Sequence, residues 1–531
     1  MTSQSPSRTT LAALAVAACL QFASAAPAAQ TCETLNTLDL PATSIASAES
    51  VPAGNFTPPT GKAIPNLPAF CRVAGVLKPS SDSNIQFEVW LPASNWNGKF
   101  QGVGNGGFAG YIDYGQMGNA VANGYATAAT DTGHRATGGV DAAWALNHPE
   151  QIADFGYRAI HETALKAKAI LHAFYGGDPK HSYFNSCSNG GRQALMEAQR
   201  YPEDYDGIVA GAPANYWTHL LANAAWDTLA LLGEKDSYIS PKKLSAIQSA
   251  ALAACDALDG VKDGVIDNPA RCHFDPGVLL CQAAETDSCL TAPQVAALKK
   301  LYAGGRTSHG QLFPGYAPGG EAEQGGWTAW ITGAAPERSL MYSFGTQFFK
   351  NMVFDNPAWD YRTFNADRDT KAADDKQSGN LNATDPDLSR FHARGGKLIL
   401  YHGWNDAAIA PQNTIDYYDS VQARVGAKQA ATFVRLFMVP GMQHCFGGAG
   451  PSSFGQFGVY SGDPDKDVDA ALERWVDKGV APERIVAAKR KNDMDPKSDI
   501  VRTRPLCAYP LVAHYKGSGS TDDAASFVCA R

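Results

Sequence analysis

Two cysteines of this sequence directly adjoin residues that are able to carry out nucleophilic and acid–base chemistry. Cys187 immediately precedes Ser188, and Cys445 immediately follows His444. A bond between the two cysteines would tie a serine to a histidine across most of the chain. Because a serine hydroxyl is a poor nucleophile until a neighbouring base accepts its proton, such a pair predicts covalent catalysis by an activated serine.

The surroundings of Ser188 are typical of a sharp turn between a strand and a helix. The run 186–191 reads Ser-Cys-Ser-Asn-Gly-Gly and lies between an expected strand over 181–185 and an expected helix over 191–201. Small neighbours relieve crowding where such a turn exposes a serine hydroxyl. The usual Gly-x-Ser-x-Gly pattern is broken at its first position, which is Ser186. A Ser-Gly-Gly stretch that opens a helix is more often an N-cap, so the motif alone leaves both interpretations open.

The order of residues along the chain narrows the choice of partners for Ser188. A nucleophile turn of this type calls for the serine, then an acid after a later strand, then a histidine. His444 lies in a glycine-containing loop directly after a strong strand, whereas His514 lies in an alternating tail segment and is interpreted as structural. Asp406 ends the loop after an expected strand over 397–401. The sequence therefore predicts a triad of Ser188, Asp406 and His444, in which the aspartate fixes the imidazole tautomer.

The negative charge that develops on an attacked carbonyl calls for two backbone N–H groups. One is expected from Asn189, the residue after the nucleophile. The other is expected from the Gly-Asn-Gly-Gly stretch at 104–107, where missing side chains allow close approach, with Gly106 or Gly107 as the donor. A plain glycine turn accounts for the same spacing, so both interpretations stay open.

A second group of candidate ligands is acidic. Asp256, Asp259, Asp263 and Asp267 recur every three or four residues around two Asp-Gly turns. Carboxylates and intervening carbonyls at such spacing converge on one hard cation, and ligands that are all oxygen favour Ca²⁺. The spacing is not that of an EF-hand, and a solvated acidic turn is the alternative. Because so many carboxylates would otherwise repel each other, we expect a structural calcium site outside the triad segments.

Alternating strand and helix signals surround the candidate triad. Strands are expected over 85–91, 99–103, 125–130, 181–185, 208–210, 397–401 and 433–439, and helices over 157–174, 191–201 and 468–478. Apolar and polar residues alternate over 85–91, which predicts a half-buried strand. The whole pattern predicts an α/β fold with a mostly parallel central sheet and flanking helices.

The middle of the chain, residues 216–389, lacks this rhythm. We interpret it as an inserted lid domain that carries the aspartate loop, with 26–215 and 390–531 forming the catalytic domain. Its candidate aromatic residues are Trp327, Trp330, Phe344, Phe348, Phe349 and Phe354. Most of them are expected in the core of the lid, and a few are expected to line an aromatic substrate pocket.

The composition and the N-terminal segment indicate the cellular compartment of the protein and the classes of partner that it does not favour. The chain has 531 residues and a net charge of −8 without runs of like charge, which does not favour nucleic acid or an anionic membrane as partner. Residues 1–25 are typical of a signal peptide whose cleavage follows Ala25, with an apolar run too short to span a bilayer. The rival interpretation is a lipoprotein signal with Cys19 as the lipidated residue. We expect a secreted or periplasmic protein without an integral membrane span.

Removal of the leader, with Cys19, would leave ten of the eleven cysteines. An even number in an exported chain favours disulfides over metal thiolates. Local spacing suggests Cys32 with Cys71, Cys255 with Cys272, Cys281 with Cys289 and Cys507 with Cys529, which leaves Cys187 and Cys445 for each other. The alternative is that all five bonds only staple loops.

Taken together, these motifs resemble the tannase and feruloyl esterase family. The resemblance rests on 187–193, 201–213, His402-Gly403 with Asp406, and Gly441-Met442-x-His444-Cys445, and it covers nearly the whole mature chain. It implies an α/β-hydrolase fold with a lid, a Cys187–Cys445 disulfide beneath the active site, and an oxyanion role for the glycine loop. It also implies Ca²⁺ held by the side chains of Asp256, Asp259 and Asp263 and by the carbonyls of Val261 and Val265.

The resemblance implies a serine carboxylesterase that cleaves small aromatic or plant-derived phenolic esters through an acyl-enzyme. Feruloyl esters are the first expectation, and galloyl esters, as for a tannase, or the mono-ester of terephthalate are alternatives. The terephthalate branch carries an aromatic residue three positions after the catalytic aspartate, where this chain has Ile409, which weakens that alternative. The family's usual glycine is replaced by Ser186, which leaves the fold expectation intact but bears on the geometry of the turn.

Two interpretations from other classes stay open. One is a secreted, calcium-stabilised binding protein on an inactive hydrolase scaffold, against which the intact Ser188, Asp406 and His444 argue. The other is a metal hydrolase that uses the aspartate loop. The sequence makes no prediction of the oligomeric state.

Overall fold

The computed structural model describes residues 1–4, 31–136, 138–458, 460–493, 495 and 497–531. Apart from its first four residues, the expected signal segment, with Cys19 and Ala25, lies outside the described residues. In the described part of the chain, no helix combines the length and the apolar character needed to cross a membrane.

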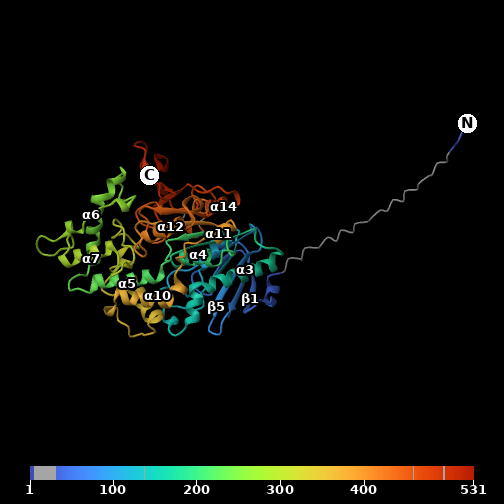
Figure 1. The fold of residues 1–531 in the computed structure, drawn as a ribbon, viewed down its shortest axis with the longest axis horizontal. Helices are drawn as coiled ribbons and strands as arrows, with labels where there is room; N and C mark the ends of the chain where they lie inside the picture. Colours follow the sequence, from blue (N-terminus) through green and yellow to red (C-terminus); the bar gives the residue numbers. More distant parts are fainter. Residues whose placement is uncertain (5–30, 137, 459, 494, 496) are drawn as a thin grey trace.

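A nine-stranded sheet forms the centre of the molecule (Figure 1). In spatial order its strands are β1 (Thr43–Val51), β4 (Phe70–Leu77), β5 (Ile85–Pro92), β7 (Ala126–Thr130), β6 (Lys99–Val103), β8 (His181–Cys187), β9 (Gly207–Gly211), β12 (Lys397–Gly403) and β13 (Val434–Val439). The first four strands pair antiparallel, and all pairs from β7 to β13 are parallel. Because parallel strands end at the same edge, the loops after β6, β8, β12 and β13 meet there.

Helices pack against this sheet as the alternating pattern predicts. They include α1 (Tyr114–Ala122), α3 (Ala159–Tyr175), α4 (Asn189–Arg200), α12 (Gln412–Val425) and α14 (Val468–Lys478). Helix α4 contacts β8 and β9, while α14 contacts β9 and β12. The close approach of α4 requires a glycine at 191, because a Cβ there would lie 2.3 Å from the Gly211 carbonyl oxygen.

Strand β5 is buried on both faces, which the sequence alternation did not predict. Its central Glu88 is 3% exposed. The Glu88 carboxylate accepts hydrogen bonds from the Arg72 guanidinium at 2.5 and 2.8 Å and from the Trp90 indole at 2.8 Å. The polar residue of the alternating pattern is thus satisfied by protein partners instead of solvent.

Between β9 and β12 the chain leaves the central sheet. This segment forms α5 (Trp217–Leu232), α6 (Leu244–Cys255), α7 (Ala292–Ala303), α8 (Trp327–Trp330), α9 (Leu340–Phe348), α10 (Ala366–Leu381) and the short pair β10 (Arg306–Thr307) and β11 (Gly310–Gln311). Figure 1 shows α5, α6 and α7, in green, beside the sheet. Helices α9 and α10 pack on α5. The interpretation of 216–389 as a separate lid domain stays a prediction.

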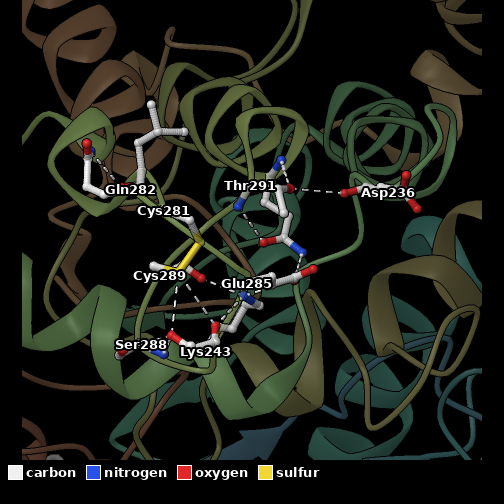
Figure 2. The surroundings of a disulfide bond; sticks show 11 residues. Asp236, Lys243, Cys281, Gln282, Glu285, Ser288, Cys289 and Thr291 are labelled. Atoms are coloured by element: carbon white, nitrogen blue, oxygen red, sulfur yellow. Dashed lines mark hydrogen bonds and ion pairs between the residues drawn. A yellow bond between two sulfur atoms is a disulfide. The ribbon is translucent and has the colours of Figure 1, made fainter.

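The structure joins cysteines in the five pairs that their spacing suggests: Cys32–Cys71, Cys187–Cys445, Cys255–Cys272, Cys281–Cys289 and Cys507–Cys529. Figure 2 shows the surroundings of the fourth pair in the inserted segment. There the Lys243 ammonium donates to the carbonyls of Thr286 and Cys289 at 2.7 and 2.5 Å and lies 3.0 Å from the Glu285 carboxylate. The disulfide closes a small loop, and the Lys243 contacts hold that loop at the start of α6, which indicates a structural role.

Candidate active site

Ser188 occupies a strained turn between β8 and α4. Its backbone has φ 66° and ψ −126°, a conformation that non-glycine residues rarely adopt and that is typical of functional sites. Its N–H donates to the Gly211 carbonyl at 3.0 Å. Ser186 fits beneath the turn only because 104 and 190 are glycines: a Cβ at Gly190 would lie 1.9 Å from Ser186 Oγ, and one at Gly104 would lie 2.9 Å from it.

The loops after β8, β12 and β13 bring the three predicted triad residues together. Ser188 Oγ lies 2.9 Å from His444 Nε2, and His444 Nδ1 lies 2.8 Å from Asp406 Oδ2. In this relay the serine hydroxyl donates to a neutral imidazole, whose Nδ1–H donates to the carboxylate. The arrangement is that of an activated serine nucleophile, assembled from segments 256 residues apart in the sequence.

Asp406 is buried, yet both of its carboxylate oxygens have partners. Oδ1 accepts from the backbone N–H groups of Ala408 at 2.7 Å and Ile409 at 2.9 Å, and Oδ2 lies 3.1 Å from His402 Nε2 as well as beside His444. Burial alone would raise the pKa of Asp406. The imidazoles of His444 and His402 outweigh burial and hold the pKa well below its ordinary value, so the carboxylate stays charged.

His402, which sequence reasoning placed only in a family motif, is the second imidazole on Asp406. It is fully buried at the end of β12, with Nε2 3.0 Å from the Ile409 carbonyl oxygen and Nδ1 2.7 Å from Thr414 Oγ1. Because both neighbours of Nε2 are acceptors, the proton is assigned to Nε2 and the Thr414 hydroxyl donates to Nδ1. Its position four residues before Asp406, in the same loop, is the signal that points to this role.

The Cys187–Cys445 disulfide lies directly beside the nucleophile and the histidine. Both cysteines are buried, and their Cα atoms lie 6.0 Å apart. Cys187 precedes Ser188 and Cys445 follows His444, so one covalent link keeps the backbones of Ser188 and His444 close together. This is the tether that the two Cys-containing dipeptides predict.

The structure distinguishes between the two glycines considered for the oxyanion hole. The Gly106 N–H already donates to the Tyr111 hydroxyl at 2.9 Å, whereas the Gly107 N–H has no partner among the described residues. Gly107 and Asn189 both line the cavity at Ser188. Asn189 begins α4, where the N–H has no acceptor within the helix. The geometry therefore favours Asn189 and Gly107 over Gly106.

Asn105 holds the glycine loop against α4. Its side-chain amide donates to the carbonyls of Tyr111 and Thr130, both at 3.0 Å, and its Oδ1 accepts from the Gln193 amide at 2.9 Å. Its own backbone N–H donates to Gln193 Oε1 at 3.2 Å, and its carbonyl accepts from the Asn189 side chain at 3.1 Å. These bonds fix the separation between the two candidate oxyanion donors.

An apolar cavity opens at Ser188. Its walls are Gly107, Ser188, Asn189, Ala214, Trp217, Leu220, Leu221, Trp330, Met341, Phe344, Ala408 and Ile409. The Trp330 ring meets the His444 imidazole edge to face, with the centroids 5.0 Å apart. Helices α5, α8 and α9 of the inserted segment thus cover the candidate triad.

The six aromatic residues that the sequence singled out in the inserted segment lie partly in the cavity wall and partly in the core. Trp330 and Phe344 line the cavity, with their rings stacked 6.1 Å apart. Trp327, Phe348 and Phe349 are buried in apolar clusters, and Phe354 packs against one of them. Most of these aromatic residues thus lie in the core and two line a cavity, while contact with a substrate stays a prediction.

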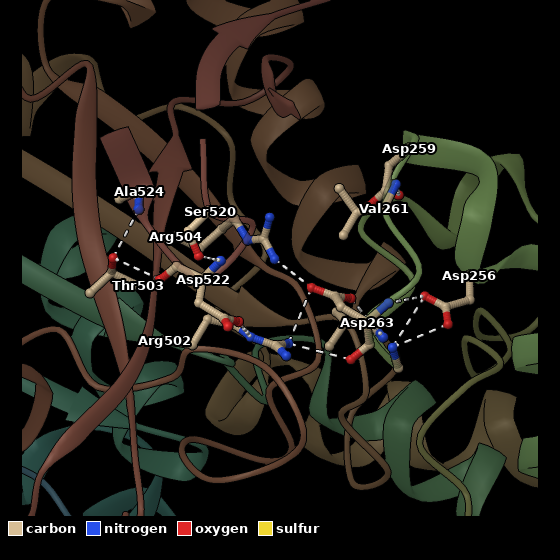
Figure 3. Close-up of polar contacts among 12 residues, drawn as sticks. Asp256, Asp259, Val261, Asp263, Arg502, Thr503, Arg504, Ser520, Asp522 and Ala524 are labelled. Carbon is tan, nitrogen blue, oxygen red and sulfur yellow. Dashed lines mark hydrogen bonds and ion pairs between the residues drawn. The ribbon is translucent and has the colours of Figure 1, made fainter. Parts of the chain in front are cut away.

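The aspartate loop is held between backbone N–H groups and two arginines (Figure 3). The Asp256 carboxylate accepts from the N–H groups of Asp263 at 3.2 Å and Gly264 at 3.1 Å, while Asp263 Oδ2 pairs with Arg504 at 2.5 Å and Arg502 at 3.1 Å. Among the described residues, no three acidic groups of this loop approach within 4.8 Å of one another. The loop's carboxylates are therefore gathered but do not converge on a single point.

The acidic side chains of this loop are nevertheless not all compensated by protein partners. Asp267 Oδ1 is buried without a hydrogen-bond partner among the described residues, and burial raises the pKa of Asp267 to about 8. Burial and the charges of Asp263 and Asp256 also raise the pKa of Asp259. A loop of oxygen donors that includes such acids has the donor chemistry that suits a hard divalent cation.

Comparison with known proteins adds to this geometry. The family described as tannase and feruloyl esterase matches residues 71–530. An uncharacterized esterase of Xanthomonas campestris is 47% identical over 97% of this chain and 93% of its own, and a probable feruloyl esterase B-1 of Aspergillus terreus is 35% identical over 86% of each. The crystal structure of feruloyl esterase B from Aspergillus oryzae superposes with a TM-score of 0.86 at 31% identity, covering 94% of this chain and 99% of that one. Tannin acyl hydrolase from Aspergillus niger, with a TM-score of 0.74 at 24% identity over 93% of each chain, shares the fold.

Proposed function

The chain belongs to the tannase and feruloyl esterase family of α/β-hydrolases, and on this premise we propose that it hydrolyses esters of hydroxycinnamic acids such as ferulate. The observation that carries the proposal is the Ser188–His444–Asp406 relay at the mouth of an apolar cavity. The chain is a carboxylic ester hydrolase, and the cavity indicates an aromatic acyl group.

In the acylation step, Ser188 Oγ attacks the ester carbonyl carbon while His444 Nε2 takes the hydroxyl proton. Asp406 stabilises the imidazolium that forms, because its carboxylate remains ionised beside two imidazoles. The N–H groups of Asn189 and Gly107 donate to the oxyanion. Collapse of the tetrahedral intermediate breaks the ester bond, and the alcohol leaves with the proton from His444.

In the deacylation step, water takes the place of the alcohol. His444 accepts a proton from the water, which attacks the acyl-enzyme carbonyl, and the same two N–H groups hold the second oxyanion. The acid leaves when Ser188 recovers its proton from the imidazolium.

The chemistry of the cavity wall supports a hydroxycinnamoyl group over the alternatives. Its described walls carry no charged side chain, and their polar side-chain groups are the Ser188 hydroxyl, the Asn189 amide and the indole N–H groups of Trp217 and Trp330. A galloyl ring would bring three hydroxyl groups into this apolar space, and a terephthalate mono-ester would bring a free carboxylate; each would leave polar groups without partners. Ile409, with its side chain in the wall, takes the place of the aromatic residue of the terephthalate branch.

Calcium is proposed as a structural ion in the aspartate loop. The side chains of Asp256, Asp259 and Asp263 and the carbonyls of Val261 and Val265 would hold it. The support is an oxygen-only donor set in a loop that includes Asp259 and Asp267, whose pKa values are raised by burial and by neighbouring acids, because a cation would relieve the cost of ionising them together. Bound calcium supplies rigidity to this loop and takes no part in the hydrolysis.

Export from the cytoplasm is proposed from the disulfides and the N-terminal pattern. Five disulfides are typical of secreted or periplasmic proteins and rare where thiols are kept reduced. Mass spectrometry of the mature N-terminus would distinguish cleavage after Ala25 from lipidation at Cys19. A mature protein that begins at the first methionine would contradict export.

The function is tested with a panel of methyl ferulate, chlorogenate, methyl gallate and the terephthalate mono-ester. We expect kcat/KM to be highest for ferulate or chlorogenate, and the Ser188→Ala variant to be inactive on all four. Preference for gallate would identify a tannase instead. No turnover of any ester, together with no labelling of Ser188 by a fluorophosphonate, would indicate a binding protein on the same scaffold.

A further inference from the structure

Arg192 is a fully buried arginine in the second turn of α4, three residues after Asn189. None of the ion pairs among the described residues involves it, so no carboxylate offsets its charge. Burial lowers the pKa of Arg192 to about 9. A guanidinium kept in such a place without a counter-ion has to be held by other contacts.

Those contacts are directed hydrogen bonds to three separate segments. Arg192 Nε donates to Asn189 Oδ1 at 2.8 Å, within α4. Nη1 donates to the Gly156 carbonyl at 2.8 Å, and Nη2 donates to the Phe155 carbonyl at 3.0 Å, in the irregular turn before α3. Nη1 also reaches the Leu381 carbonyl at 3.4 Å, at the end of α10 in the inserted segment.

The guanidinium also packs between two aromatic rings. It lies 4.7 Å from the Phe155 ring centroid and 5.1 Å from that of Trp217. Trp217 begins α5 and forms part of the cavity wall at Ser188. One side chain therefore contacts an oxyanion-hole residue, a wall of the acyl cavity and the inserted segment that covers both.

The Asn189 side chain links Arg192 to the glycine loop that carries the second candidate oxyanion donor, Gly107. Its Oδ1 accepts from Arg192, and its Nδ2 donates to the Asn105 carbonyl at 3.1 Å, two residues before Gly107. The chain of contacts from Arg192 through Asn189 to Asn105 thus spans both candidate N–H donors. A change at Arg192 would alter the aim of these donors without removing either one.

We propose that Arg192 is a positioning residue that couples the inserted segment to the oxyanion hole. It fixes the orientation of Asn189 and the position of Trp217 together. The acyl group is therefore bound in the cavity while both N–H donors point at its carbonyl oxygen. This inference rests on Ser188 being the nucleophile of the proposed esterase. It assigns Arg192 an effect on the transition state that exceeds its effect on the bound substrate.

The test compares Arg192→Lys with Arg200→Lys. Arg200 lies on the same helix, donates to the Gly379 carbonyl of the inserted segment and packs 4.4 Å from the Tyr157 ring centroid, but no hydrogen bond links it to Asn189. Arg200 is therefore matched in side-chain chemistry and in helix, and it differs in lacking the contact with Asn189 and in being only partly buried. We expect Arg192→Lys to lower kcat on methyl ferulate by about 10–100-fold with KM within about threefold, and Arg200→Lys to change neither.

A second measurement distinguishes misorientation of the oxyanion donors from a general loss of structure. An aromatic boronic acid that adds to Ser188 imitates the oxyanion, whereas the free aromatic acid imitates the ground state. In Arg192→Lys the boronate should bind more weakly by the same factor as kcat falls, with the affinity for the acid nearly unchanged. An equal loss for boronate and acid, or a loss of kcat matched by Arg200→Lys, would overturn the proposal.

If Arg192→Lys does not fold, Asn189→Ala provides the alternative variant. It keeps the backbone N–H and removes the side chain through which Arg192 acts, so it should lower kcat and boronate affinity in the same way. Full activity of Asn189→Ala would overturn the proposal. If the wild-type protein hydrolyses none of the four esters, the proposed function fails on its own, and the rate at which a fluorophosphonate labels Ser188 still compares these variants.

Discussion

Two buried aspartates of this protein have pKa values that are shifted in opposite directions. Asp406 is fully satisfied by two backbone N–H groups and two imidazoles, and its pKa is lowered. Asp267 is buried to a similar degree, but its neighbours include Asp259 and Asp263, one of its oxygens has no partner among the described residues, and its pKa is raised to about 8. The difference lies in the neighbours and not in the burial.

The contrast separates a carboxylate whose partners are all supplied by the protein from one that lacks a partner on one oxygen. The catalytic carboxylate must be charged at neutral pH before any substrate arrives, so the protein supplies every compensating group itself. The loop gathers four acidic side chains around two arginines, and in the proposal above a bound cation would supply the partner that they lack. The two regions meet near Gly441, where a Cβ would lie 3.1 Å from Val265 Cγ1, on the loop that leads to His444.

The largest expected effect tests whether the two regions are independent. Ser188→Ala removes the nucleophile and touches no group of the aspartate loop. We expect kcat to fall by about 10⁵–10⁶-fold, while the thermal stability and its response to calcium stay as in the wild type. Ester hydrolysis and calorimetry with and without calcium measure the two effects. Retained hydrolysis would refute the assignment of Ser188.

The next effect concerns the charge of Asp406. In Asp406→Asn an amide replaces the acceptor of the His444 Nδ1–H, which favours the wrong imidazole tautomer. We expect kcat to fall by about 10⁴-fold at neutral pH. Steady-state kinetics measure this loss, and fluorophosphonate labelling of Ser188 should slow in parallel. Near-normal turnover would show that the Asp406 charge is dispensable and would remove the contrast with Asp267.

Much of this site follows from the sequence because topology fixes it. Once a parallel sheet is recognised, the loops after its strands meet at one edge, and Ser188, Asp406 and His444 follow from their order along the chain. The cysteine pairs follow in the same way, since four have short separations and the fifth remains. These features depend on chain order, which the sequence displays directly.

Other features depend on contacts that chain order does not reveal. Gly106 and Gly107 look alike in the sequence, and they are distinguished by the Tyr111 hydroxyl on the Gly106 N–H and by the position of Gly107 in the cavity wall. In the sequence Arg192 looks like an ordinary helix residue, and only the structure shows that its guanidinium packs between Phe155 and Trp217. Alternation in β5 predicted an exposed face because the Arg72 partner of Glu88 comes from another strand. In each case a tertiary partner changes the meaning of a local pattern.

A smaller effect concerns the covalent link within the catalytic region. The double variant Cys187→Ala/Cys445→Ala opens a connection between positions 258 residues apart. We expect a loss of about 2–5 kcal/mol in the free energy of unfolding and a kcat about 10–100-fold lower, because the Ser188 and His444 backbones lose their common tether. The matched control is Cys281→Ala/Cys289→Ala, which opens a loop far from Ser188 in the sequence and should leave kcat unchanged. Equal kcat in the two double variants would contradict a role of the first bond in catalysis.

The smallest effect is a pH dependence with opposite signs in the two regions. Asp406, whose folded-state pKa is lowered, contributes stability that is present above its ordinary pKa of about 4 and is lost at lower pH. Asp267 has a folded-state pKa of about 8, so without calcium the folded state holds a proton that the unfolded state releases near pH 4. Its contribution is therefore present below about pH 4 and is lost as the pH rises towards 8.

Calcium should cancel this second dependence, because the ion takes the place of the proton as the neutralising charge. We expect the increase in melting temperature on adding calcium to grow steadily from pH 5 to pH 8, by a few degrees in all. Asp267→Asn, which imitates the protonated acid, should flatten the stability of the chelated protein over the same range. Melting curves in a chelator and in excess calcium measure both effects. A calcium response as large at pH 5 as at pH 8 would mean that the loop already carries its full charge there, and that the two aspartates do not differ in the way their surroundings imply.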